Sequence, residues 1–109
     1  MAYGDIKQLS TEGQQLTTDV STIYTAPSGK RAQIGTVLIH NTDTSARDVR
    51  VFSNTNANTG RVLYIALDSS ETYEFSPKVP FTLEANQTLQ ANASENAVVN
   101  TLIFGREEV

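Results

Sequence analysis

Residues 81–93, FTLEANQTLQANA, decide the fold of this chain because they contain two alternating stretches joined by a short turn. Apolar and polar side chains alternate on both sides of Glu84–Gln87. Alternation with a period of two is the pattern of a strand that buries one face. Asn86 stands where glycine is common in such turns, and asparagine tolerates the left-handed conformation that the turn needs. The stretch therefore predicts an antiparallel hairpin.

The same rhythm continues outward from this hairpin through most of the chain. Turn signals separate apolar runs at intervals of about ten residues, which is typical of a sandwich or barrel of short strands. Pro27–Lys30 is one such turn, since proline presets the first dihedral and Gly29 accepts a positive φ. No segment has the 3.6-residue period of an amphipathic helix. The predicted strands are 16–26, 31–41, 48–54, 61–67, 72–75, 81–85, 88–93 and 97–105.

These strands predict an all-β fold, an antiparallel two-sheet sandwich of about eight strands with jelly-roll or immunoglobulin-like topology. A small barrel is the main alternative. The 109 residues are enough for one domain. We expect residues 1–15 to form an extended N-terminal arm, residues 16–105 the sandwich domain, and residues 106–109 an acidic C-terminal tail.

Composition excludes several classes of partner and chemistry. Eight basic and twelve acidic residues give a net charge of −4, which disfavours nucleic acid as a partner. No apolar run approaches the roughly 20 residues that cross a membrane, and the first fifteen residues do not resemble a secretion signal. We therefore expect a soluble chain with no membrane partner. Cysteine is absent, so the chain has no disulfide, thiolate nucleophile or cysteine zinc site.

Catalytic and metal-binding patterns are also missing from the sequence. His40 is the single histidine, and triads and histidine metal sites need further partners. We expect His40 to lie at a strand end and hydrogen-bond to a loop; a ligand or a pH-sensitive contact is the alternative. Glu71 and Glu74 are three residues apart, which points them to opposite faces of a strand. Gly29-Lys30 lacks the rest of a phosphate-binding loop. We predict a non-enzyme with no catalytic residues, cofactor or metal.

Two polar loops carry oxygen ligands of the kind that calcium uses. They are Thr42–Thr44, around Asp43, and the series Asn54, Asn56 and Asn58. Neither has the spacing or acidic density of a known calcium loop, so both are interpreted as turns. The same segments, Asp43–Ser45 and Asn54–Gly60, would form the contact surface if the chain were a receptor- or glycan-binding module.

Surplus aliphatic residues indicate a protein partner. Residues 31–41 and 61–67 carry apolar side chains on both faces, and we expect the surplus to be buried against another subunit. The arm could also become ordered on a neighbour through scattered apolar side chains; the alternative is a frayed terminus. The candidate partner contacts are Tyr3, Ile6 and Leu9 in the arm, with Val62 and Tyr64 in the sandwich.

Three stretches of the chain resemble small structural proteins of tailed bacteriophage particles. They are residues 23–32 (IYTAPSGKRA), 37–42 (VLIHNT) and 81–93 (FTLEANQTLQANA). In those proteins a Y-T-x-P-x-G-K turn leads into a strand that ends in x-N-T, and a late L-x-x-G-x-x-L-x-A-x-A hairpin precedes a strand closed by glycine. The resemblance covers about Val20 to Gly105. This chain departs from the pattern at Asn86, where glycine is commoner.

The resemblance implies a β-sandwich component of the virion that is assembled in the host cytoplasm. Such a protein is typically a homotrimer and binds the major capsid protein or other virion proteins as a decoration, or cement, protein. The alternative that it implies is a tail, neck or fibre component. Both roles depend on broad contact surfaces rather than on chemistry.

Overall fold

A computed structural model describes residues 4–9, 14–53, 61–78 and 81–108. Within them the chain forms ten strands and no helix, which confirms the predicted all-β class. The strands are β1 (Lys7–Gln8), β2 (Gln14–Gln15), β3 (Ser21–Thr25), β4 (Ala32–Asn41), β5 (Arg47–Ser53), β6 (Arg61–Leu67), β7 (Thr72–Phe75), β8 (Phe81–Leu83), β9 (Thr88–Ala93) and β10 (Val99–Glu107).

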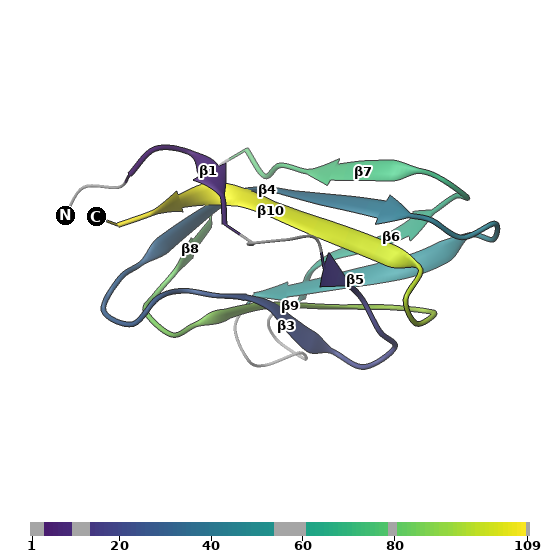
Figure 1. The fold of residues 1–109 in the computed structure, drawn as a ribbon, viewed down its shortest axis with the longest axis horizontal. Coiled ribbons are helices and arrows are strands. Elements are labelled where there is room, and N and C mark those ends of the chain that lie inside the picture. Colours follow the sequence, from purple (N-terminus) through teal and green to yellow (C-terminus); the bar gives the residue numbers. More distant parts are fainter. Residues whose placement is uncertain (1–3, 10–13, 54–60, 79–80, 109) are drawn as a thin grey trace.

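The strands form two antiparallel sheets that lie face to face (Figure 1). The larger sheet has the order β1-β10-β4-β7, with β2 also pairing with β10 and β8 also pairing with β4. The smaller sheet has the order β3-β9-β5-β6. The predicted two-sheet sandwich is therefore confirmed.

The pairing follows a concentric rule that identifies the topology. β5 pairs with β6, β4 with β7 and β8, β3 with β9, and the two arm strands pair with β10. The chain is thus one long antiparallel ribbon, folded at the β5–β6 hairpin and rolled up. The additional pairs β10–β4 and β9–β5 close the roll. This is the strand order of a jelly roll, one of the two predicted topologies.

The core lies between the sheets and is made of the inward side chains of alternating strands. On β4 and β10 the burial pattern alternates along the strand, so that each presents one face to the other sheet. The largest fully buried apolar side chains are Leu16, Ile34, Ile39, Leu67, Leu83, Leu89 and Ile103. Several aliphatic residues and little aromatic area therefore hold the sheets together.

Two turns have the conformation that their sequences predict. Gly29 has a φ of 74°, and Lys30 N donates to Pro27 O. Asn86 has a φ of 69°, and Gln87 N donates to Glu84 O. Asparagine thus replaces glycine in the second turn with the left-handed geometry intact.

A β-bulge interrupts the central β4–β10 pair. Phe104 pairs with Thr36 and Gly105 pairs with Ile34, so Gly35 is the extra residue on β4. A Cβ added at Gly105 would lie 2.0 Å from the carbonyl oxygen of Gln33. Glycine at 105 is therefore required by the close approach of the two backbones at this bulge.

Some boundaries differ from the sequence prediction. The sequence predicts a first strand at 16–26, but β3 begins at Ser21; Leu16 is buried, and its backbone N–H donates to Val99 O of β10. Within the predicted arm, β1 and β2 pair with β10 of the same chain. β10 extends into the predicted tail as far as Glu107.

Candidate docking surfaces

The outward side chains of β4 and β10 form a surface that we call the β4–β10 face. Its apolar centre consists of Leu38 on β4 with Leu102 and Phe104 on β10; Leu38 and Leu102 lie opposite each other in the register. All three are half-buried, whereas their inward neighbours on the same strands are almost completely buried. Within the described chain, the outer face of residues 31–41 is therefore only partly covered.

Two adjoining hollows follow the β4–β10 face. The larger has a volume of about 820 Å³ and is lined by Leu38 and Leu102 together with polar groups. The smaller has a volume of about 360 Å³ and lies between Phe104 and Ile6. An apolar floor with a polar rim is the usual composition of a protein contact surface.

The polar rim of the larger hollow contains the single histidine. His40 Nδ1 lies 2.7 Å from Thr72 Oγ1 on β7, so His40 contacts a neighbouring strand rather than the predicted loop. Asn100 faces His40 across the β4–β10 register, and its Oδ1 is buried without a hydrogen-bond partner. Gln15 of β2 lines the other side. The rim therefore places polar side chains around the apolar centre.

The candidate residues of the arm fall into different environments. Ile6 is 68% exposed and lies beside the smaller hollow. Leu9 is half-buried and packs against the core of its own sandwich, and its backbone N–H donates to Ile103 O. Tyr3 lies outside the described residues. Of these residues, Ile6 is thus the one that the structure places beside the β4–β10 face.

The other two candidates lie on β6, away from the β4–β10 face. Tyr64 is 49% exposed on the outer side of the smaller sheet. The guanidinium of Arg50 lies 4.5 Å from the centre of its ring, and its hydroxyl donates to Asp48 at 3.4 Å. Val62 is the extra residue of a bulge in β6, and its side chain lies outside the described part. The candidates whose side chains the structure describes, Ile6, Leu9 and Tyr64, therefore do not lie on one surface.

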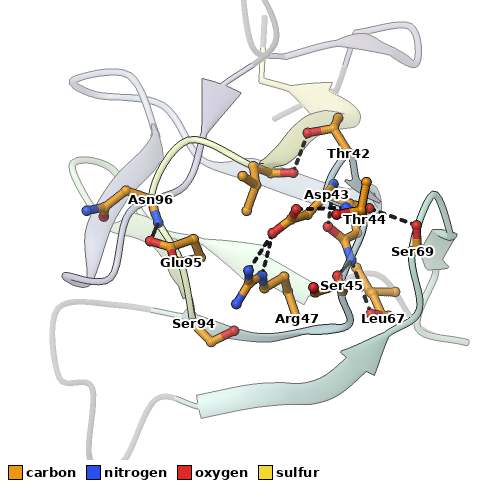
Figure 2. Close-up of polar contacts among 12 residues, drawn as sticks. Thr42, Asp43, Thr44, Ser45, Arg47, Leu67, Ser69, Ser94, Glu95 and Asn96 are labelled. Carbon is orange, nitrogen blue, oxygen red and sulfur yellow. Dashed lines mark hydrogen bonds and ion pairs between the residues drawn. The ribbon is translucent and has the colours of Figure 1, made fainter.

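A second surface is the polar end of the sandwich, where the loops 42–46, 68–71 and 94–98 meet (Figure 2). Buried Asn41 organises it: its Nδ2 lies 3.0–3.2 Å from the carbonyl oxygens of Ser45, Leu67 and Asp68. Its Oδ1 accepts from Asp43 N at 3.0 Å. Local sequence places Asn41 at a strand end but does not predict this role, because its partners come from segments distant in the chain.

Asp43, one of the residues considered as a calcium ligand, is engaged within its own loop. Its carboxylate accepts from Arg47 Nε at 2.7 Å and from Thr44 N at 2.7 Å, and Ser69 Oγ donates to its carbonyl oxygen (Figure 2). The hydrogen bond from Arg47, with that from Thr44, holds the pKa of Asp43 below its usual range. These contacts fix the loop against its neighbours.

The two loops proposed for glycan contact are attached to opposite ends of one strand. Asp43–Ser45 precede β5, and Asn54–Gly60 follow it and lie outside the described residues. Seven strand residues span about 20 Å. The two ends of β5 from which they extend are therefore far apart.

The opposite end of the sandwich carries two buried or half-buried carboxylates from the predicted tail region. Glu107 accepts from the hydroxyl of Tyr24 and pairs with Lys7. Partial burial alone would raise the pKa of Glu107, but the hydrogen bonds from Tyr24 and Lys7 outweigh burial and lower it. Burial raises the pKa of Tyr24, and the bond to Glu107 raises it further.

Glu108 forms the second of these contacts and is 4% exposed. It accepts from Arg31 N at 2.6 Å and from Arg31 Nη2 at 3.1 Å. These hydrogen bonds from Arg31 lower the pKa of Glu108. The contacts tie the end of β10 to the residue that precedes β4, so this part of the predicted tail belongs to the sandwich.

Two further features were sought in the described part of the chain. It contains no group of three or more His, Cys, Asp or Glu side chains that could hold a metal ion. No helix long and apolar enough to cross a membrane occurs in residues 4–9, 14–53, 61–78 and 81–108.

Comparisons with known proteins give structural similarity to solved chains but no family. No protein-family model and no curated protein matches the chain. One similar solved structure is described as "Structure of infectious bursal disease virus Gt strain", with 8% sequence identity and a TM-score of 0.35. The similarity covers 94% of this chain and 32% of that chain, so the chain spans about a third of its length. At this level the similarity carries no argument about function.

Proposed function

We propose that this chain is a non-enzymatic structural protein of a tailed-phage virion, a decoration or cement protein that binds neighbouring capsid subunits. The observation that carries the proposal is the β4–β10 face, where apolar side chains on the two central strands are left half-exposed beside two hollows. A contiguous apolar surface with a polar rim favours a protein neighbour. The phage-like turns and hairpin of the sequence give that neighbour its class.

In this role the chain acts through contact rather than through catalysis. Leu38, Leu102 and Phe104 would lose their remaining exposure against the capsid, and each buried apolar side chain contributes on the order of 1 kcal/mol. His40 and Asn100 at the rim would supply hydrogen bonds that fix the orientation of the contact. Many copies, each held modestly, would then stabilise the capsid together. The homotrimer implied by the resemblance is part of this proposal, as is location in the virion after assembly in the host cytoplasm.

The test adds the purified chain to capsids of the phage that encodes it, after the chain has been stripped from them. We expect the chain to rebind and to raise the temperature at which the capsids disrupt. The variant Leu102→Asp places a charge at the apolar centre and should weaken binding at least tenfold, a change of about 1.4 kcal/mol.

The matched control is Thr22→Asp, which places the same charge on an exposed position of β3 in the other sheet. It should bind as the parent does. Capsids whose heat resistance does not change on adding the parent chain, or equal binding by Leu102→Asp and Thr22→Asp, would contradict the proposal.

The second candidate function is a tail, neck or fibre component that binds a receptor glycan at the polar end. The convergence of the loops 42–46, 68–71 and 94–98 favours it (Figure 2). Asn41 and Arg47 hold these loops in place, so the exposed hydroxyl of Thr44 stands on a preorganised surface. Glycan-array binding that is lost in Asn41→Ala and retained in Leu102→Asp would favour this candidate over the cement role.

A further inference from the structure

Along one side of the sandwich, β6 ends the smaller sheet, β7 ends the larger sheet, and the turn 68–71 joins the two strands. We call this side the β6–β7 edge, defined by Leu63, Ile65, Tyr73 and Phe75. The first two and Phe75 pack against the core yet are only half-buried, and Tyr73 is 38% exposed. By contrast, the apolar core side chains of β3, β4, β5, β9 and β10 are buried. The sandwich therefore lacks part of its cover here.

Among the residues that the structure describes, the backbone at the same place is an open sheet edge. β6 pairs with β5 on one side and ends the order β3-β9-β5-β6. It is seven residues long, whereas the other strands at sheet edges have two to five. Natural proteins shorten or charge their exposed edges, because an open edge can pair with another strand. Residues 62–67, VLYIAL, contain no charge.

We infer that a second copy of this chain pairs with β6 in an antiparallel, two-fold arrangement centred on Tyr64. This register places Leu63 opposite Ile65 of the second copy, so inward side chains meet inward side chains and the two cores become continuous. Tyr64 meets its own equivalent on the outer face, and aromatic cross-strand pairs are favourable. No charged residue faces another within 62–66, so the strand is complementary to itself.

The sequence of β6 favours a second copy as the occupant, because Leu63 and Ile65 flank Tyr64 symmetrically and residues 62–67 contain no charge. A strand that matches its own reverse satisfies an isologous interface with one patch per subunit. The eight-stranded sheet that results also removes the long open edge from both partners. The contact lies on the smaller sheet, apart from the β4–β10 face, and does not depend on the capsid role.

Native mass of the purified chain at micromolar concentration is the first test. An even number of copies is expected: a dimer, or a hexamer if the three-fold contact of the proposed trimer forms as well. A monomer or a trimer would overturn the inference, and a trimer would leave the proposed capsid function standing. Tyr64→Lys should weaken the dimer at least tenfold, whereas Val20→Lys, at a 39% exposed position elsewhere, should not.

Disulfide cross-linking tests the register. The chain contains no cysteine, so an introduced cysteine can form a disulfide only with its equivalent in another copy. Directly opposed residues have Cα atoms about 4.5–5.5 Å apart, which a disulfide can bridge. Tyr64→Cys should therefore give a covalent dimer that a reductant reverses.

The matched control is Ala66→Cys, on the same exposed side of the same strand. In this register residue 66 lies opposite residue 62 of the second copy, and residue 66 of that copy is four residues further along its strand, about 13 Å away. The Ala66→Cys variant should therefore remain monomeric on a non-reducing gel. Equal cross-linking of the two variants, or none by Tyr64→Cys, would refute the register and with it the two-fold contact.

Discussion

Replacing Gly105 with alanine should separate the two central strands of the larger sheet. The new Cβ would lie 2.0 Å from the carbonyl oxygen of Gln33 and 3.1 Å from Leu9 Cδ1. Carbon and oxygen atoms in contact usually stay about 3.3 Å apart, so the overlap with the carbonyl is roughly 1.3 Å. The clash is with backbone, and a side-chain rotation cannot relieve it. β4 must therefore move away from β10 at the bulge.

The magnitude follows from what this movement breaks. Overpacking in a filled interior costs about 1–3 kcal/mol. The strand separation also weakens one or two ladder hydrogen bonds, each with a net contribution of about 1 kcal/mol. We expect Gly105→Ala to lower the free energy of unfolding by about 3 kcal/mol. For a domain of this size that corresponds to a fall in Tm of about 12 °C.

Gly35→Ala is the matched control because Gly35 lies at the same bulge on the partner strand. A Cβ there would meet its nearest atom, the carbonyl oxygen of Phe104, at an ordinary contact distance of 3.7 Å. The φ of Gly35 is not in the left-handed region. Alanine at this position should therefore change the free energy of unfolding by less than about 1 kcal/mol. Urea unfolding followed by circular dichroism measures both. The steric reasoning fails if Gly105→Ala loses no more stability than Gly35→Ala.

Three further predictions concern the core, the polar end and the acid response. Leu89→Ala removes a completely buried side chain and should cost about 2–5 kcal/mol in urea unfolding; a cost below 1 kcal/mol would contradict the described core. Asn41→Asp replaces an amide donor with a carboxylate facing carbonyl oxygens. Asn41→Asp should lower the midpoint of thermal unfolding more than Asn41→Ala does. The reverse order would argue against the role of Asn41 in organising the polar end. Glu108 has a lowered pKa in the folded state, so its contribution is present above about pH 4.5 and is lost as pH falls through the lower, folded value. The stability difference between the parent and Glu108→Gln should therefore narrow in acid, and a pH-independent difference would refute the charged pairing with Arg31.

Local patterns were sufficient to predict much of the fold. The strands 61–67, 72–75 and 88–93 have the predicted bounds, and the turn at Asn86 has the predicted left-handed conformation. Each depends on residues within a few positions of one another, through alternation or through the conformational preference of asparagine. The two-sheet architecture follows from the number and spacing of such strands.

Features formed by distant residues could not be predicted in this way. Lys7–Gln8 and Gln14–Gln15 are polar pairs without a period, yet they become strands because β10 offers them an edge. Asn41 looks like any residue at a strand end, and its importance depends on loops that approach it from elsewhere in the chain. The candidate partner contacts lie in different places for the same reason. The sequence shows that Ile6, Leu9 and Tyr64 are apolar or aromatic, but it does not show which residues of the fold cover them.

The concentric pairing of the strands has a consequence for biosynthesis. β10 lies next to β4 in the larger sheet, and the arm strands also need it as a template. The β5–β6 hairpin, in contrast, joins neighbouring segments and can close early because its loop is short. A ribosome must therefore translate as far as Glu107 before the larger sheet can assemble. Until then β4 lacks the strand that pairs along one of its edges, and an unpaired edge can pair with another chain.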